Sequence, residues 1–141
     1  MKNMQEEQGL VNAEPVNGNK ERNQAVTELA GACTEENLWK CVMAFQGYPF
    51  FTSSGLPFTY TLKTGRTYTK EMFIDRRTNS KSLAWSSVKL AFKKALEKRD
   101  RTFSGPKEIG EIRGISYSYS RLWRFGVIRV PADVGRKLIG D

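Results

Sequence analysis

Charge divides this chain of 141 residues into two unequal parts, and only the larger part carries apolar residues with a helix or strand period. Residues 1–36 hold three basic and seven acidic residues, a net charge of −4, whereas residues 37–141 hold 20 basic and 8 acidic residues, a net charge of +12. The few apolar residues near the N-terminus follow no period, and such a segment buries too little apolar surface to fold. We therefore expect an acidic leader over residues 1–33 that is mostly disordered or weakly helical near residues 24–30, and a single basic domain over residues 34–141.

The chain contains no histidine and only two cysteines, Cys33 and Cys41. Without histidine it cannot form a histidine-containing zinc site, a Ser-His-Asp triad or a histidine general base. Two cysteines are too few for a disulfide scaffold, and we expect both as reduced thiols. No apolar run approaches the roughly 20 residues that cross a bilayer, and residues 1–9 lack the apolar core of a secretory signal. The sequence therefore predicts a cytoplasmic, non-enzymatic protein without a metal or cofactor.

Between Thr34 and Asp75 the pattern predicts one helix followed by three strands. Thr34 can cap a helix that ends at Gly47, and acidic residues follow the cap, where they favour the positive end of the helix dipole. Three short runs rich in apolar and aromatic residues then follow, and the turn between the second and third contains Gly65. The runs are residues 48–53, 58–63 and 67–75. We predict an α+β fold in which a three-stranded antiparallel sheet packs with helices.

A second helix is expected over residues 83–99, where apolar residues recur at helical spacing. Lysines flank both sides of this apolar stripe, and a solvated charged face is the ordinary explanation for them. Phosphate binding is the alternative, because only Glu97 offsets the positive charge on this helix. Leu83 and Leu90 fall nearly opposite the stripe, so we expect the C-terminal segment or a protein partner to cover them.

Residues 106–125 follow the residue order of a helix-turn-helix. Gly110 stands where the two helices cross, and Gly114 comes four residues later, where the turn needs a left-handed backbone. Arg113 departs from the pattern, because an apolar residue is usual at its position. The second helix would present Tyr117, Ser118, Arg121 and Arg124 to a major groove. The same run also fits a glycine-rich loop followed by an ordinary amphipathic helix with Tyr119, Leu122, Trp123 and Phe125 in the core.

Two further surfaces are candidates for nucleic acid. Residues 76–82 form a basic connector that combines hydroxyls and an amide with three cations, a composition that suits either a phosphate clamp or a solvated turn. The predicted sheet is the alternative, with Thr61, Lys63, Arg66, Thr67 and Lys70 in contact. The residues that we predict to bind nucleic acid are Arg76, Arg77, Lys81, Lys89, Lys93, Lys94, Arg113, Tyr117, Arg121 and Arg124.

Several short runs in the basic body are distinctive in their order of aromatic, glycine, proline and serine residues. They are Gly47-Tyr48-Pro49-Phe50, Gly55-Leu56-Pro57-Phe58-Thr59-Tyr60, Phe73-Ile74-Asp75-Arg76-Arg77, Ser80-Lys81-Ser82, Ser86-Ser87-Val88 and Gly114-Ile115-Ser116-Tyr117-Ser118-Tyr119. On these runs, the segment from Gly47 to Val130 resembles a group of short uncharacterised proteins from gut Firmicutes and their mobile elements. The resemblance carries no assigned activity. It implies a bacterial, mobile-element setting, where small proteins often bind DNA or inhibit host defence nucleases.

The leading hypothesis is a small DNA-binding protein that acts on double-stranded DNA, for example as a regulator from a mobile element. A homodimer would suit a helix-turn-helix protein. The alternative is a phage or mobile-element inhibitor that binds a host defence effector such as a CRISPR nuclease, with the Leu83/Leu90 face as its protein-binding surface. A metal-dependent nuclease is a third hypothesis, for which no convincing second carboxylate is present.

Overall fold

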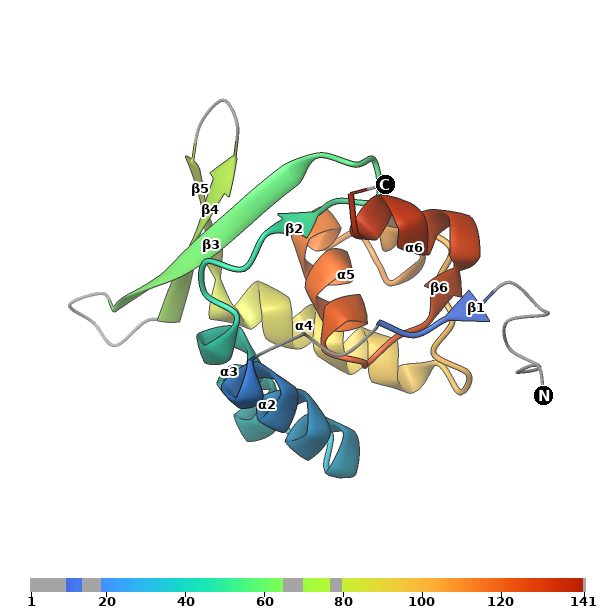
Figure 1. The fold of residues 1–141 in the computed structure, drawn as a ribbon, viewed down its shortest axis with the longest axis horizontal. Helices are drawn as coiled ribbons and strands as arrows, with labels where there is room; N and C mark the ends of the chain where they lie inside the picture. The colour runs from blue at the N-terminus through green and yellow to red at the C-terminus, as the bar shows by residue number, and fades with distance from the viewer. Residues whose placement is uncertain (1–9, 14–18, 65–69, 77–79, 141) are drawn as a thin grey trace.

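A computed structural model describes residues 10–13, 19–64, 70–76 and 80–140, and it confirms the α+β class (Figure 1). Its elements are β1 (Leu10–Val11), α2 (Lys20–Gly31), α3 (Glu35–Ala44), β2 (Phe50–Phe51), β3 (Pro57–Thr64), β4 (Lys70–Arg76), β5 (Ser80–Ala84), α4 (Trp85–Glu97), the 3-10 helix η1 (Pro106–Glu108), α5 (Ile115–Arg124), β6 (Val130–Pro131) and α6 (Ala132–Leu138). Among the described residues, no helix combines the length and the apolar character that crossing a membrane requires.

The main sheet has four antiparallel strands in the order β2-β3-β4-β5, so the prediction of three strands is wrong in number. The additional strand, β5, begins at Ser80 within the predicted basic connector, and the helix after it begins at Trp85 rather than at Leu83. Ser80, Lys81 and Ser82 gave no apolar signal because β5 is an edge strand. Residues 77–79 of the connector lie outside the described residues.

The sheet packs on the helices through alternate residues of β3. Phe58 and Tyr60 are buried, whereas Thr61 between Tyr60 and Leu62 is exposed, as the period of two requires. The hydroxyl of Tyr60 donates a hydrogen bond of 2.6 Å to the carbonyl oxygen of Val42 in α3. This hydrogen bond connects the sheet to α3.

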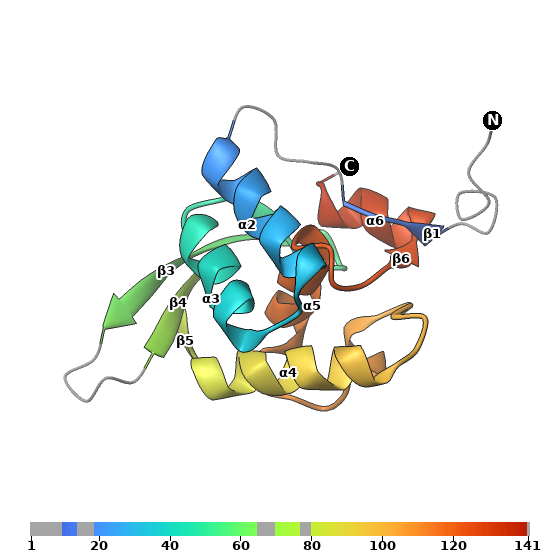
Figure 2. The ribbon, with the colours of Figure 1, turned by 90° about the horizontal axis from the view of Figure 1, so that it is seen from below.

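Helix α5 is the central element of the fold. Figure 2 shows it among α2, α3, α4 and α6. All residues from Tyr117 to Phe125 are buried, including the guanidinium of Arg121, which lies 5.0 Å from the centre of the Tyr60 ring. Burial lowers the pKa of Arg121 to about 10. From Tyr117 to its end, the helix is covered by the rest of the chain.

The helix-turn-helix is not confirmed. Gly114 has the expected left-handed backbone, with φ of 71°. However, the first helix of the motif is reduced to the single 3-10 turn η1, and the second is the buried α5. Leu83 is buried against the turn at Gly114, so the C-terminal segment covers this residue, which is one of the two alternatives expected for it. Leu90 alone remains exposed.

Part of the predicted leader is ordered, in contrast to the expectation of mostly disordered chain. Helix α2 is capped by Asn19, whose side chain accepts a hydrogen bond from the backbone N–H of Arg22. Arg22 then donates from Nε to the carbonyl oxygen of Ala44, at 2.9 Å, and Leu29 is 1% exposed. Because only Ala25 and Leu29 of α2 are buried, its apolar stripe is too short to stand out in the sequence.

The first described residues of the chain pair with a strand near its C-terminus. β1 pairs antiparallel with β6 in a separate two-stranded sheet, with Val11 opposite Val130. Gly135 of α6 makes room for this strand, because a Cβ there would lie 2.7 Å from the Val11 side chain. Asn12 thereby lines the same pocket as Arg99, Asp100 and Arg101 of the loop that follows α4.

Candidate anion-binding site

Three arginines from two distant segments meet beyond the C-terminal end of α4. Arg99 and Arg101 belong to the loop after α4, and Arg129 directly precedes β6. Together with Asn12 and Asp100 they line a predominantly polar pocket of about 490 Å³. We call this the arginine pocket. Arg99 is exposed, whereas Arg101 and Arg129 are half-buried.

Backbone hydrogen bonds hold the two segments of the pocket together. The N–H of Arg129 donates to the carbonyl oxygen of Arg101, at 2.8 Å, and the N–H of Phe103 donates to the carbonyl oxygen of Arg129, at 3.0 Å. Buried side chains flank these contacts on both segments, namely Phe103 on one and Ile128 on the other. The core therefore fixes the segments, and the arginines between the buried residues are left at the surface.

The loop adopts an uncommon backbone conformation at the pocket. Arg101 has φ of 54°, in the left-handed region that residues other than glycine rarely occupy. Its N–H donates to the carbonyl oxygen of Lys98 at 3.2 Å, and its guanidinium contacts Cys33 Sγ at 3.5 Å. A conformation of this cost persists only where its surroundings fix it, and such positions cluster at functional sites.

Basic residues outnumber acidic residues in the lining of the pocket. Three guanidinium groups and the single carboxylate of Asp100 give formal charges of +3 and −1. Asp100 Oδ1 accepts the backbone N–H of Thr102 at 3.1 Å. An arrangement of this kind suits an anion with several oxygens, because guanidinium groups bind such anions through paired N–H donors.

The lysines of α4 extend this positive surface only in part. Lys93 and Lys94 are exposed and form no ion pair within the described residues. Lys94 lies one turn before Lys98, on the same side of the helix. Lys89, in contrast, lies 3.9 Å from the carboxylate of Glu35. Lys98 lies 3.9 Å from Glu108 and also contacts the carbonyl oxygen of Thr102.

Comparison with known proteins assigns no family. No protein-family model, curated protein or solved structure matches this chain. The function is therefore inferred from the chemistry of the site.

Three of the residues that we predicted to contact nucleic acid lie in the core. Tyr117 is 8% exposed, Arg121 is 1% exposed and Arg124 is 9% exposed. The guanidinium of Arg124 lies 5.3 Å from the Tyr48 ring and 5.0 Å from the Trp123 ring. The guanidinium groups of Arg121 and Arg124 lie against aromatic rings inside the protein, and Arg121 also donates a hydrogen bond to the carbonyl oxygen of Tyr117. In this structure neither cation is available to base edges.

The other predicted contacts are dispersed. Arg113 is exposed in the turn before α5, next to the start of α4 and therefore at the end opposite the arginine pocket. Arg76 ends β4 and pairs in register with Phe58, while Lys81 lies within β5 opposite Ile74. Arg77 lies outside the described residues, so the predicted clamp is described only by the backbone on its two sides.

The sheet is a weaker candidate surface than the arginine pocket. Strand register places the acidic residue Glu71 directly opposite Lys63, one of the predicted contacts, and places Asp75 opposite Thr59. Lys70 pairs with Thr64, on the alternate set of positions. Arg66 and Thr67 lie outside the described residues.

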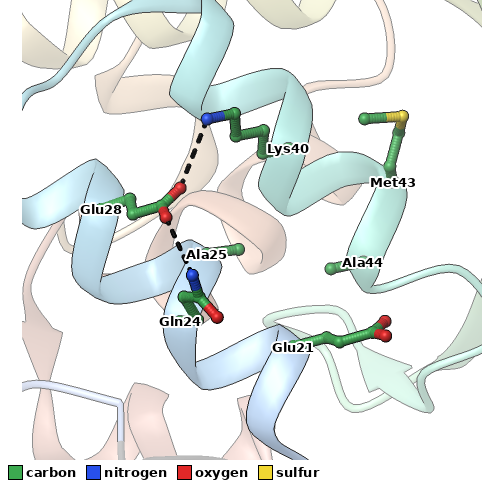
Figure 3. A pocket seen from close by; sticks show the side chains of 7 residues that line it. All are labelled: Glu21, Gln24, Ala25, Glu28, Lys40, Met43 and Ala44. Atoms are coloured by element: carbon green, nitrogen blue, oxygen red, sulfur yellow. Dashed lines mark hydrogen bonds and ion pairs between the residues drawn. The ribbon is translucent and has the colours of Figure 1, made fainter.

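A second pocket, of about 330 Å³, lies between α2 and α3 and is unsuitable for phosphate (Figure 3). Glu21 and Glu28 line it, and Glu28 accepts hydrogen bonds from Gln24 at 3.2 Å and from Lys40 at 3.4 Å. The one lysine of this pocket is therefore paired, and the carboxylates would repel an anion.

The arginine pocket combines residues that the sequence pattern did not connect. Arg99 and Arg101 were visible only as a basic extension of the second helix, and Arg129 and Asn12 gave no functional signal. The one hint was a single cation inside the apolar run from Val127 to Val130. Only the bridge between Thr102 and Arg129 shows that this cation belongs beside Arg101.

Proposed function

We propose that the protein is a non-enzymatic nucleic-acid-binding protein that contacts phosphate groups through the arginine pocket and through Lys93 and Lys94 of α4. The observation that carries this proposal is that three arginines and a single aspartate line one pocket. The net charge of +12 over residues 37–141 supplies the long-range attraction that a polyanion would experience.

The proposal favours contact with the nucleic-acid backbone over reading of base sequence. Arginine and lysine contacts to phosphate fix the position of a protein on its ligand but carry little sequence information. The side chains predicted to read bases, Tyr117 and Arg121, are buried. We therefore expect binding to double-stranded DNA with little dependence on sequence and with a strong dependence on salt, because each phosphate contact releases counterions.

Fluorescence anisotropy of the full chain with a random-sequence DNA duplex, titrated at several salt concentrations, tests the proposal. The test variant is Arg99→Ala with Arg101→Ala. The control, Lys20→Ala with Lys137→Ala, removes the same charge from exposed positions outside the pocket. We expect weaker binding of the test variant and a salt dependence that is shallower by about 0.9 for each phosphate that the variant no longer binds. Equal behaviour of the two double variants would remove the pocket from the interface.

Two further variants separate the pocket from the surfaces that the sequence pattern favoured. Arg113→Ala removes an exposed cation at the opposite end of α4, and Arg76→Ala with Arg77→Ala removes two cations of the β4–β5 connection. We expect Arg113→Ala to bind as the unmodified protein does. A loss of affinity confined to the Arg76/Arg77 variant would locate the interface on the hairpin instead. If the unmodified protein binds no nucleic acid at low salt, the proposal is wrong, and the defence-effector inhibitor becomes the hypothesis to test by co-purification.

A further inference from the structure

We infer that this protein has a second binding site, which takes a small carboxylate with an apolar body. The site is a mainly apolar pocket of about 250 Å³ whose lining includes Trp123 of α5, Val11 of β1 and three residues of α6, Ala132, Gly135 and Arg136. We call it the indole pocket. Its volume lies below the roughly 300–1,000 Å³ of sites for drug-sized ligands, so it suits a smaller molecule. The arginines of the two pockets differ, so this site is independent of the proposed function.

The indole of Trp123 supplies a hydrogen-bond donor that has no acceptor. Trp123 is 3% exposed, and its Nε1 atom is buried without a hydrogen-bond partner in the described part of the chain. Buried tryptophan N–H groups usually have a partner, and a donor that is buried without one destabilises the protein. The loss of water from this donor has already taken place on folding. An acceptor oxygen that reaches Nε1 therefore gains a hydrogen bond without that cost on the side of the protein.

The ring edge that carries Nε1 faces α6. A Cβ built on Gly135 would lie 3.8 Å from Cζ2 of Trp123, and in the indole a single ring carbon separates Cζ2 from Nε1. The same Cβ would lie 2.7 Å from Cγ2 of Val11. The absence of a side chain at Gly135 thus leaves space where Trp123 and Val11 meet α6, and all three residues line the pocket.

Access to Nε1 requires a small movement of the pocket wall. The atom itself is closed to solvent, so a ligand oxygen has to displace a neighbouring side chain. The wall formed by β1, which lies beside α6 in Figure 2, is a strand of two residues that pairs with β6 at Leu10 and Val11. Segments with few contacts open locally at low free-energy cost. We therefore expect Val11 to be the side chain that moves.

Apolar side chains around the indole select the body of the ligand. Val11 and Ala132 are half-buried and Ile139 is 48% exposed, and all three line the pocket together with Trp123. A ligand that covers these side chains with its own carbon atoms removes apolar surface from water, which favours binding. A small anion without carbon, such as inorganic phosphate, gains nothing from them. The lining therefore favours an organic ligand.

A cation at the pocket selects the charge of the ligand. Arg136 is exposed on α6 and forms no ion pair within the described residues. The described lining contains no acidic residue. Arg124 also lines the pocket, but its guanidinium already lies against the rings of Tyr48 and Trp123. Arg136 therefore favours an anion over a neutral molecule through its charge, and a carboxylate supplies both that charge and an acceptor oxygen for Nε1.

Two-dimensional proton–nitrogen NMR of the full chain tests the inference, because each tryptophan gives one indole N–H signal. The chain has three tryptophans, and the signal of Trp123 is the one lost in Trp123→Phe. If that variant does not fold, Trp39→Phe and Trp85→Phe, at half-buried positions, identify the signal by elimination.

The probe is benzoate, and it is compared with two other molecules. Benzamide has the same ring without the charge, and acetate has the charge without the ring. We expect benzoate to move the Trp123 signal to lower field in a saturable way, because the N–H acquires an acceptor, with a dissociation constant of roughly 1 mM. Benzamide should bind roughly fivefold more weakly, the upper limit of an exposed ion pair. Acetate should bind at least about tenfold more weakly, because it buries less apolar surface.

Two substitutions in α6 locate the ligand. Arg136→Ala should weaken benzoate binding by up to roughly fivefold and leave benzamide binding unchanged. The matched control, Lys137→Ala, removes the same charge from the next exposed position of α6, outside the lining of the pocket, and should leave both affinities unchanged. Ala132→Leu places a larger apolar side chain at a half-buried position of the lining and should weaken the binding of both molecules.

Each other outcome overturns a stated part of the inference. A Trp123 signal that none of the three probes moves would overturn the binding site and leave water as the partner of Nε1. Equal shifts of all three indole signals would show a general effect of the added molecule and would overturn the site as well. Equal affinity for benzoate and benzamide, or equal effects of Arg136→Ala and Lys137→Ala, would overturn the choice of a carboxylate. None of these measurements uses nucleic acid, so the proposed function stands or fails separately.

Discussion

Replacing Gly114 with alanine tests the local geometry on which the assignment of α5 to the core depends. Gly114 has φ of 71°, and a Cβ built at this position would lie 2.5 Å from Cδ1 of Leu83. Leu83 is 1% exposed, so its side chain has little room to move away. The substitution therefore brings two separate costs, one from the backbone and one from packing.

The magnitude follows from adding these costs. A left-handed backbone costs an alanine about 1–2 kcal/mol relative to a glycine, and overpacking in a close-packed core costs about 1–3 kcal/mol. We expect Gly114→Ala to lower the free energy of unfolding by about 2–5 kcal/mol. Gly126→Ala is the matched control, because Gly126 also has positive φ, 83°, but a Cβ there would lie 3.8 Å from Cγ1 of Val26, at ordinary contact distance. This control should cost about 1–2 kcal/mol.

Urea unfolding followed by tryptophan fluorescence measures both variants, and a thermal scan should show a midpoint shift of roughly 3 °C for each kcal/mol. Leu83→Ala, alone and combined with Gly114→Ala, completes a double-mutant cycle. The combined variant should be more stable than the sum of the single effects implies, because the smaller residue 83 leaves room for the new methyl group. If Gly114→Ala costs no more than Gly126→Ala, the contact between this turn and Leu83 is not as close as described.

Three further predictions concern α2, the hydrogen bond of Tyr60 and the buried thiol of Cys41. Leu29→Ala should cost about 2–5 kcal/mol of stability in urea unfolding, because Leu29 is 1% exposed and anchors α2; a loss below roughly 0.5 kcal/mol, the usual range of a surface substitution, would indicate that α2 does not belong to the folded domain. Tyr60→Phe should cost about 1–3 kcal/mol in the same assay, because it leaves the buried carbonyl oxygen of Val42 without its hydrogen bond of 2.6 Å, and a neutral effect would contradict that bond. Burial, and to a lesser extent the charge of Glu28, raises the pKa of Cys41 from 9.0 to about 12. The unfolded chain therefore releases this proton at lower pH than the folded chain, so the contribution of Cys41 to stability is complete below about pH 9 and is lost as the pH rises toward 12. Unfolding measured between pH 8 and pH 11 should show a smaller decline in Cys41→Ala than in the unmodified protein, and equal declines would contradict the burial of this thiol.

The sequence pattern predicted features that depend on neighbouring residues. Thr34 caps α3, since its side chain accepts the N–H of Asn37, and the alternation of Phe58, Tyr60 and Leu62 marks β3. The left-handed backbone at Gly114 was likewise predicted from its place in a turn. Each of these features is decided by a short stretch of chain, through hydrogen bonds between nearby residues or through the side-chain period of a strand.

The errors concern how distant segments pack. The apolar spacing of α5 was compatible both with a surface helix and with a core helix, and Arg121 and Arg124 favoured the surface. In the structure, aromatic rings from other elements surround these cations, with the Tyr60 ring 5.0 Å from Arg121. A local pattern does not contain those rings. For the same reason β5 was missed and α2 was expected only as a weak helix, since β5 is held by pairing with β4 and α2 by contacts with α3.

The sequence by itself determined the sign and the distribution of charge, the absence of histidine chemistry, the α+β class and the positions of several turns, because composition and local periodicity are properties of the unfolded chain as well. Only the tertiary structure decided which cations remain at the surface and which of them meet. Arg101 and Arg129 are 28 positions apart, and a backbone hydrogen bond of 2.8 Å places them in one pocket, while the core encloses Arg121 and Arg124. A charge acts on a ligand through its position and its solvation, and both are set by the packing of segments that are remote in sequence.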